Sequence, residues 1–138
     1  MIKLSQNSGF VLRYRAALFV VALSFFFMAI ALAGKVLGDT ARLVDVLPFV
    51  LELVFGCIGV VFASRFGRDP YRFKIPVIAL LVAAVAFHFW LMAFYVDFTN
   101  CPFGTIFCST MFYGYLAILA LMAVLLAMAT PASSPPVN

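Results

Sequence analysis

Charged side chains are scarce in this sequence. Only 10% of its 138 residues are Asp, Glu, Lys or Arg, and 67% are hydrophobic. A soluble domain usually carries about 25% charged residues. No polar stretch is long enough to fold as a separate water-soluble domain. The composition therefore excludes an ordinary soluble protein and indicates a single integral membrane domain.

The residue types on which most catalytic and cofactor sites depend are also few. There is one histidine, His88, whereas b-type haem needs an axial ligand and usually a second one. The three cysteines form no C-x-x-C pair, the motif typical of quinone-linked thiol oxidoreductases. We find no metal-ligand set and no nucleophile with a matching base, so we expect no enzyme, no metal and no cofactor.

The basic residues do not form the continuous face that nucleic-acid binding requires. The net charge is +4, but the lysines and arginines occur in short groups beside apolar runs. Such groups orient helices in a membrane and attract anionic headgroups. We therefore expect membrane lipids as partners, together with other membrane proteins or further copies of the chain, and no nucleic acid.

Four apolar runs are each long enough to cross a hydrocarbon core about 30 Å thick. We expect helices at about 16–34, 46–64, 75–96 and 106–129, within one domain over 16–130, with 1–15 and 131–138 outside the bilayer. Pro48 and Pro76 are placed in the first turn of their helices, where a missing N–H costs nothing. The predicted fold is an all-α, antiparallel four-helix transmembrane bundle.

The first apolar run also fits a secretory signal peptide. Basic residues precede it, and Ala31, Leu32 and Ala33 stand before Gly34 at its end, as at a cleavage site. Cleavage of 1–33 would leave three spans. This alternative stays open, although with three spans the loop at Tyr71 and both ends would have an unfavourable orientation across the membrane.

Basic residues favour one side of the membrane. The connection before the third run contains four of them and a single acid, Asp69. Lysine and arginine in short loops prefer the cytoplasmic side. We therefore assign to the inner face Arg13, Arg15, Arg65, Arg68, Arg72 and Lys74. Both termini are then cytoplasmic, in a plasma membrane or an endomembrane.

Two cysteines lie in the loop assigned to the outside, which contains no basic residue. These are Cys101 and Cys108. In an oxidising compartment they would form a disulfide, and a loop this short gives roughly 2 to 3 kcal/mol in the chain-entropy model. We predict this bridge as a structural feature.

Glu52 is the one acid well inside an apolar run, about 9 Å from the outer end of its helix, and His88 lies about 12 Å from the outer end of the next helix. Because these helices run in opposite directions, both side chains reach a similar depth. A buried carboxylate needs a protein partner. We predict a buried polar cluster of Glu52, His88, Tyr113 and Ser24. Either it only selects helix pairing, or it couples the movement of a proton or cation.

Small residues recur at helical spacing after Glu52. Gly56, Gly59 and Ala63 follow on one face, and small side chains let another helix approach closely. Gly114 offers a similar surface on the fourth helix. We predict that these residues serve helix packing and permit oligomers.

From about residue 71 to 125, the order of features resembles the MARVEL-type tetraspan membrane proteins, particularly the short fungal kind. The matching features are a short basic loop, KIPV at 74–77, FW at 89–90, AF at 93–94 and two cysteines in the second outer loop. The resemblance implies a non-enzymatic role in membrane microdomains, vesicle traffic or cell-surface contacts. Only Trp90, Cys101 and Cys108 would transfer, as structural positions.

Two classes of function follow from these patterns. The first is a membrane organiser, scaffold or accessory subunit that acts through lateral contacts with lipids and other membrane proteins. The second is a small proton- or cation-coupled transporter or channel component that uses Glu52 and His88.

The sidedness is testable by labelling intact cells. We expect a membrane-impermeant thiol reagent to reach the loop cysteines from outside after reduction, because their loop is placed outside. A protease or tag placed near Arg68 should be inaccessible from there. The reverse pattern would show that the orientation is inverted.

Overall fold

The computed structural model describes residues 8–36, 43–94 and 103–129. These residues form four helices and no strand: α1 (Ser8–Val36), α2 (Leu43–Phe66), α3 (Pro70–Phe94) and α4 (Thr105–Met128). Each helix is long and apolar enough to cross a membrane. The predicted all-α, multi-pass architecture is confirmed at this level.

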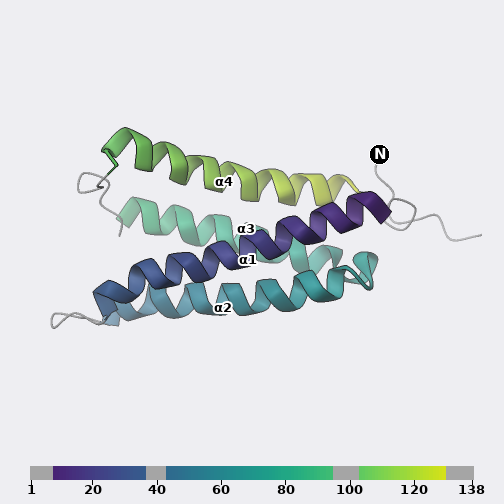
Figure 1. The fold of residues 1–138 in the computed structure, drawn as a ribbon, viewed down its shortest axis with the longest axis horizontal. Coiled ribbons are helices and arrows are strands. Elements are labelled where there is room, and N and C mark those ends of the chain that lie inside the picture. Colours follow the sequence, from purple (N-terminus) through teal and green to yellow (C-terminus); the bar gives the residue numbers. More distant parts are fainter. Residues whose placement is uncertain (1–7, 37–42, 95–102, 130–138) are drawn as a thin grey trace, which may run out of the picture.

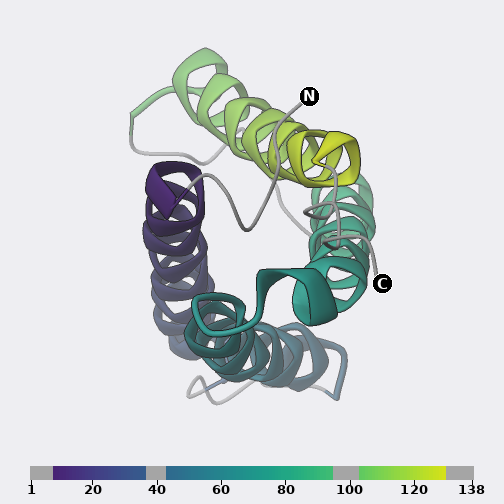
Figure 2. The same ribbon diagram turned by 90° about the vertical axis from the view of Figure 1, so that its right-hand side faces the viewer.

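The helices run alternately in opposite directions. α1 begins, α2 ends, α3 begins and α4 ends at the same end of the bundle (Figure 1). Helices adjacent in sequence pack on each other: α1 on α2, α2 on α3 and α3 on α4. Seen along the bundle, the four described helices surround a common interior (Figure 2). α1 and α4 diverge toward the end where α4 begins (Figure 1).

α1 and α2 approach each other closely because α2 presents small residues. A Cβ atom on Gly59 would lie 3.1 Å from Ala22 Cβ, and one on Gly56 would lie 2.9 Å from the Phe26 ring. Ala63, two turns from Gly56, is fully buried. The structure thus places the predicted packing residues of this helix in the bundle interior, where they permit close helix contact.

Gly114 is not at such a contact. A Cβ atom built there would meet no heavy atom within 4 Å. The buried side of α4 is formed by Leu116, Leu119, Met122, Ala123 and Leu126, and helical periodicity turns Gly114 away from that side. Gly114 therefore does not serve packing between the described helices, and its role in contacts with a partner helix stays a prediction.

The helices begin earlier than predicted, and the difference is largest for α1 and α3. α1 begins at Ser8 rather than at about 16, and α3 begins at Pro70 rather than at 75. Charged residues do not end these helices, because long cationic side chains can reach the headgroups while the helix continues. At α3 the start signal is Asp69 followed by Pro70: Arg72 N–H donates to Asp69 Oδ1 at 3.2 Å, as at an N-cap.

The two prolines placed in first helical turns lie deeper. Pro48 is inside α2, which begins at Leu43, and Pro76 is inside α3. Each removes one backbone hydrogen bond to the residue four positions earlier. Membrane helices tolerate such positions because neighbouring helices and local adjustments compensate the carbonyl.

The basic residues assigned to the inner face share one end of the bundle. Arg13 and Arg15 lie near the start of α1, Arg65 lies in the last turn of α2, and the others follow in the turn and in early α3. Lys74 Nζ donates to the Ala129 carbonyl just after α4, at 2.5 Å. A lysine at this position satisfies a carbonyl that the helix itself leaves unpaired.

Some predictions lie outside the described residues. Cys101 is one of them, so the bridge to Cys108 stays a prediction, and segments 1–7 and 130–138 are others. Cys57, a free cysteine of α2, is exposed.

Gly59 provides a test of the close α1–α2 contact. Replacing Gly59 with Leu should lower the free energy of unfolding by about 1 to 3 kcal/mol, because Ala22 leaves no room for the added atoms. Unfolding of the detergent-solubilised protein would be followed by circular dichroism. Gly114→Leu is the matched control, since its surroundings are open, and it should be near neutral. Equal destabilisation by both would contradict the assignment.

Candidate functional site

The bundle interior contains one pair of ionisable side chains in the described part of the chain. Glu52 comes from α2 and His88 from α3, and both are fully buried. Their closest atoms, Glu52 Oε1 and His88 Nε2, are 2.7 Å apart. Since α2 and α3 are antiparallel, positions at similar depths meet. This pair is the candidate functional site.

The other ring nitrogen of His88 fixes the proton count of the pair. His88 Nδ1 lies 2.7 Å from the Ala84 carbonyl oxygen, one turn earlier. A carbonyl only accepts, so Nδ1 carries the proton that it donates. A neutral ring then has no proton on Nε2. Two unprotonated acceptors would repel each other at the distance between Nε2 and Oε1, so one proton lies between them.

This shared proton makes the pair neutral overall. Held by the ring, it gives imidazolium beside carboxylate; held by the carboxyl, it gives two neutral groups. The distance of 2.7 Å between His88 Nε2 and Glu52 Oε1 is that of a strong hydrogen bond. Neither atom makes a hydrogen bond of good geometry within the described residues. Glu52 Oε2 has no hydrogen-bond partner among the described residues.

Aromatic rings from α1, α3 and α4 contact His88, and Phe55 of α2 contacts two of these rings. Phe25 stacks on the imidazole with ring centroids 5.5 Å apart and planes at 18°. Tyr115 meets it edge-on at 5.3 Å. The remaining rings around the site are Phe55, Phe87 and Phe112. When the ring is protonated, the stacked Phe25 face adds a cation–π contact. The enclosure is apolar and keeps water from the pair.

Ser24 joins this layer through Tyr115. The two hydroxyl oxygens are 2.9 Å apart, and Ser24 Oγ donates to the Val21 carbonyl at 2.5 Å. A serine hydroxyl has one proton, so the Tyr115 hydroxyl is the donor between them. This bond ties α1 to α4 beside the pair.

Tyr113, the tyrosine predicted for the cluster, is not part of it. Its side chain is 57% exposed. Two positions along a helix turn a side chain by about 200°, so Tyr113 and Tyr115 face opposite sides. Tyr115 shares the spacing of the buried Leu119, Met122 and Leu126. That periodicity was the signal that identifies Tyr115 from the sequence.

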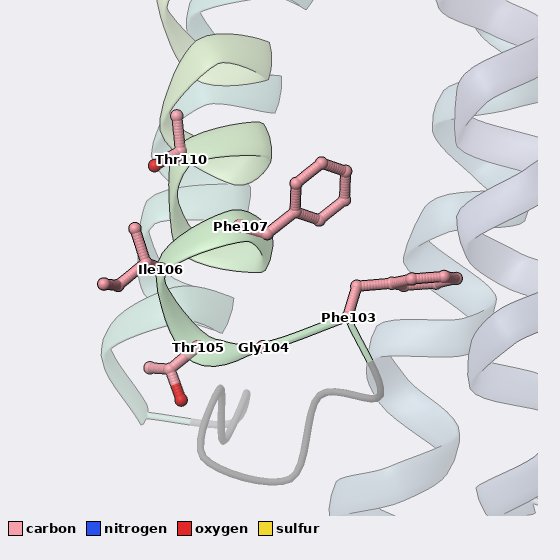
Figure 3. A pocket seen from close by; sticks show the side chains of 6 residues that line it. All are labelled: Phe103, Gly104, Thr105, Ile106, Phe107 and Thr110. Atoms are coloured by element: carbon pink, nitrogen blue, oxygen red, sulfur yellow. The ribbon is translucent and has the colours of Figure 1, made fainter.

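The described residues offer the pair no companion metal ligands. Within the described ranges, no three His, Cys, Asp or Glu side chains could hold a metal ion. A hollow of about 650 Å³ lies at the start of α4, where Phe103 and Phe107 point to the same side (Figure 3). Its other lining residues are Gly104, Thr105, Ile106 and Thr110. None of them belongs to the pair.

No family model, no curated protein and no solved structure matches this chain.

The shared proton predicts strong coupling between the two side chains. Glu52→Leu strands Nε2 of His88, and His88→Leu strands the carboxyl group, so each should cost about 1 to 3 kcal/mol in the free energy of unfolding. The double variant should cost less than the sum, with a coupling energy of about 1 to 2 kcal/mol. Denaturant unfolding in detergent would measure all three.

The control cycle combines His88→Leu with Tyr113→Phe. These two changes should add, because Tyr113 lies on the exposed side of α4. Additive costs for Glu52→Leu and His88→Leu would show that the two side chains do not share a proton.

Proposed function

We propose that this chain is a non-enzymatic four-span membrane protein with both termini cytoplasmic. It acts as a membrane organiser, scaffold or accessory subunit through lateral contacts. One observation carries the proposal: the only buried ionisable pair of the described residues is enclosed by aromatic rings, whereas the outward faces of the helices are apolar.

The enclosed pair suits an architectural role. Glu52 Oε1 and His88 Nε2 are 2.7 Å apart, and rings of α1 and α4 pack on the imidazole. Separating α2 from α3 would leave a carboxyl group and an imidazole unpaired in hydrocarbon. Buried polar pairs of this kind select one helix arrangement over others. The pair therefore favours one register between α2 and α3.

The outward faces suit lateral contacts with lipids and partner helices. In the most apolar window of each span, only 28 to 33% of the residues are buried within the chain. Large apolar side chains are exposed on every described helix, among them Val20, Phe27, Val54, Ile75, Phe89 and Leu121. Gly114 and Ala117 are exposed on α4, and small residues allow a partner helix to approach closely.

The resemblance to MARVEL-type tetraspan proteins supports the same class of function. Its features fall on the basic end, on α3 and on the loop before α4. Trp90 stacks on Phe87 at 6.3 Å, which is consistent with a structural position. We propose membership of this family together with the function.

A second candidate is a small proton- or cation-coupled transporter or channel component. The specific observation in its favour is the Glu52 Oε2 atom, which has no hydrogen-bond partner among the described residues, in a pair that already carries one proton. Membrane-embedded carboxyl groups commonly serve ion coupling. Exchange with water would require the ring enclosure to open.

Glu52→Gln separates the two candidates. The Gln amide can donate to His88 Nε2 and replace the protonated carboxyl group, but it cannot release a proton. In proteoliposomes under an imposed pH gradient, we expect the wild-type chain to give no proton flux above protein-free liposomes. Glu52→Gln should keep its abundance and its co-purifying partners, whereas Glu52→Leu should lose both.

A different pattern supports the transporter. Proton flux through the wild-type chain that Glu52→Gln abolishes, with normal folding, would contradict the scaffold proposal. Purification of the wild-type chain in mild detergent gives the independent measurement. A stable larger complex is expected for a scaffold or accessory subunit, and a chain that purifies only alone would count against it.

A further inference from the structure

Four arginines surround the turn between α2 and α3, residues 67–69. Arg65 lies in the last turn of α2, and its carbonyl oxygen accepts the N–H groups of Arg68 and Asp69, each at 3.0 Å. Arg72 lies in the first turn of α3. Arg15 reaches the same turn from α1. Three of these arginines thus come from three different helices, and the fourth, Arg68, lies in the turn itself.

These cations have no acidic partner in the described part of the chain. The one ion pair among the described residues joins His88 to Glu52, far inside the bundle. Asp69 is the acid of the turn, and its Oδ1 accepts the Arg72 backbone N–H. Four arginines and one aspartate give the turn a net charge of 4 − 1 = +3. An anion from outside the chain would neutralise this excess of positive charge.

Arg15 is built into the turn rather than extended into solvent. A Cβ atom at Gly67 would lie 2.6 Å from Arg15 Cδ and 2.8 Å from Nε. The arginine stem therefore packs on bare glycine backbone. Its Nε atom is buried and has no hydrogen-bond partner among the described residues. A buried donor without an acceptor is costly, and an anion at the turn would supply one.

Aromatic rings help to hold two of the guanidinium groups. Arg15 lies over the Phe19 ring at 5.5 Å, and Arg65 lies over the Phe73 ring at 6.0 Å. Stacking on a ring restricts the guanidinium plane. These groups are therefore partly ordered before any ligand arrives, which lowers the entropic cost of binding.

The turn is placed at the level of membrane phosphates. It joins the candidate spans Val46–Phe66 and Pro70–Phe94, so it lies at the edge of the hydrocarbon core. Guanidinium groups bind phosphate oxygens through two parallel hydrogen bonds.

We propose that this turn binds the phosphate group of an anionic membrane lipid. The net charge of +3 favours a headgroup with more than one negative charge, such as a phosphate monoester, over one with a single charge. The acyl chains of the same lipid then lie against the apolar outer faces of the adjacent helices. This surface is independent of the buried pair and of the role proposed above.

Lipid titration of the full chain in mild detergent tests the proposal. Native mass spectrometry would measure the Kd of phosphatidic acid, phosphatidylglycerol and phosphatidylcholine with matched acyl chains. Phosphatidic acid should bind most tightly and phosphatidylcholine most weakly. Equal binding of phosphatidylcholine and phosphatidic acid would overturn the proposal.

Charge removal locates the surface. Arg68→Gln with Arg72→Gln should weaken phosphatidic acid binding by roughly fivefold for each arginine, the usual effect of one basic residue near a membrane surface. Both side chains are exposed, so folding should be retained. Arg13→Gln is the matched control at the same end of the bundle, and it should have a smaller effect than either single change. An equal effect would show diffuse attraction and no built site.

Gly67→Ala tests the role of Arg15 without changing the charge. Its Cβ atom would displace the Arg15 stem, whereas Gly67 is not among the described residues with positive φ. Binding of phosphatidic acid should weaken at constant net charge. Unchanged binding would remove Arg15 from the site.

Inorganic phosphate should compete poorly with phosphatidic acid, because it lacks acyl chains. Competition equal to that of phosphatidic acid would show a free-anion site and overturn the lipid assignment.

Discussion

A polar side chain in the hydrocarbon layer has no water to bind, so its partner must come from the protein. Glu52 and His88 meet this requirement together at 2.7 Å, with one proton between them. Their contact requires α2 and α3 to pair in one register. Phe25 of α1 and Tyr115 of α4 then close around the imidazole. The packing at this layer, where all four described helices meet, depends on that single contact.

The remaining helix contacts are of two kinds. α1 and α2 pack through small residues, so their backbones come close along their length. α1 and α4 diverge, and hydrogen bonds of tyrosine side chains connect them. Tyr14 donates to the Met122 carbonyl at 2.6 Å, and Tyr115 donates to Ser24. The bundle therefore combines a close backbone contact between α1 and α2 with a wider separation of α1 and α4, which tyrosine side chains bridge.

The fold class and the central pair could be predicted from the sequence because both depend on simple arithmetic. Run length gives the spans, and helix rise brings Glu52 and His88 to similar depths. The tyrosine of the cluster could not be predicted from depth alone, because rotation about the helix axis matters as much. Tyr113 is at a suitable depth but on the outer side of α4. The starts of α1 and α3 could not be predicted from cationic residues, because these residues continue inside the helices, and Asp69 with Pro70 carries the signal at α3.

The attachment of α4 has a mechanical consequence. Its last turns are held by Tyr14 from α1 and by Lys74 from α3, while its first turns diverge from α1 (Figure 1). The Tyr115 to Ser24 hydrogen bond is a further attachment, nearer the first turns of α4. The stretch from Thr105 to Tyr115 extends about 15 Å beyond it, so a tilt of about 10° would displace the start of α4 by about 3 Å. The attachments to α1 thus leave the first turns of α4 the widest range of movement, at the end of the bundle opposite the basic turn.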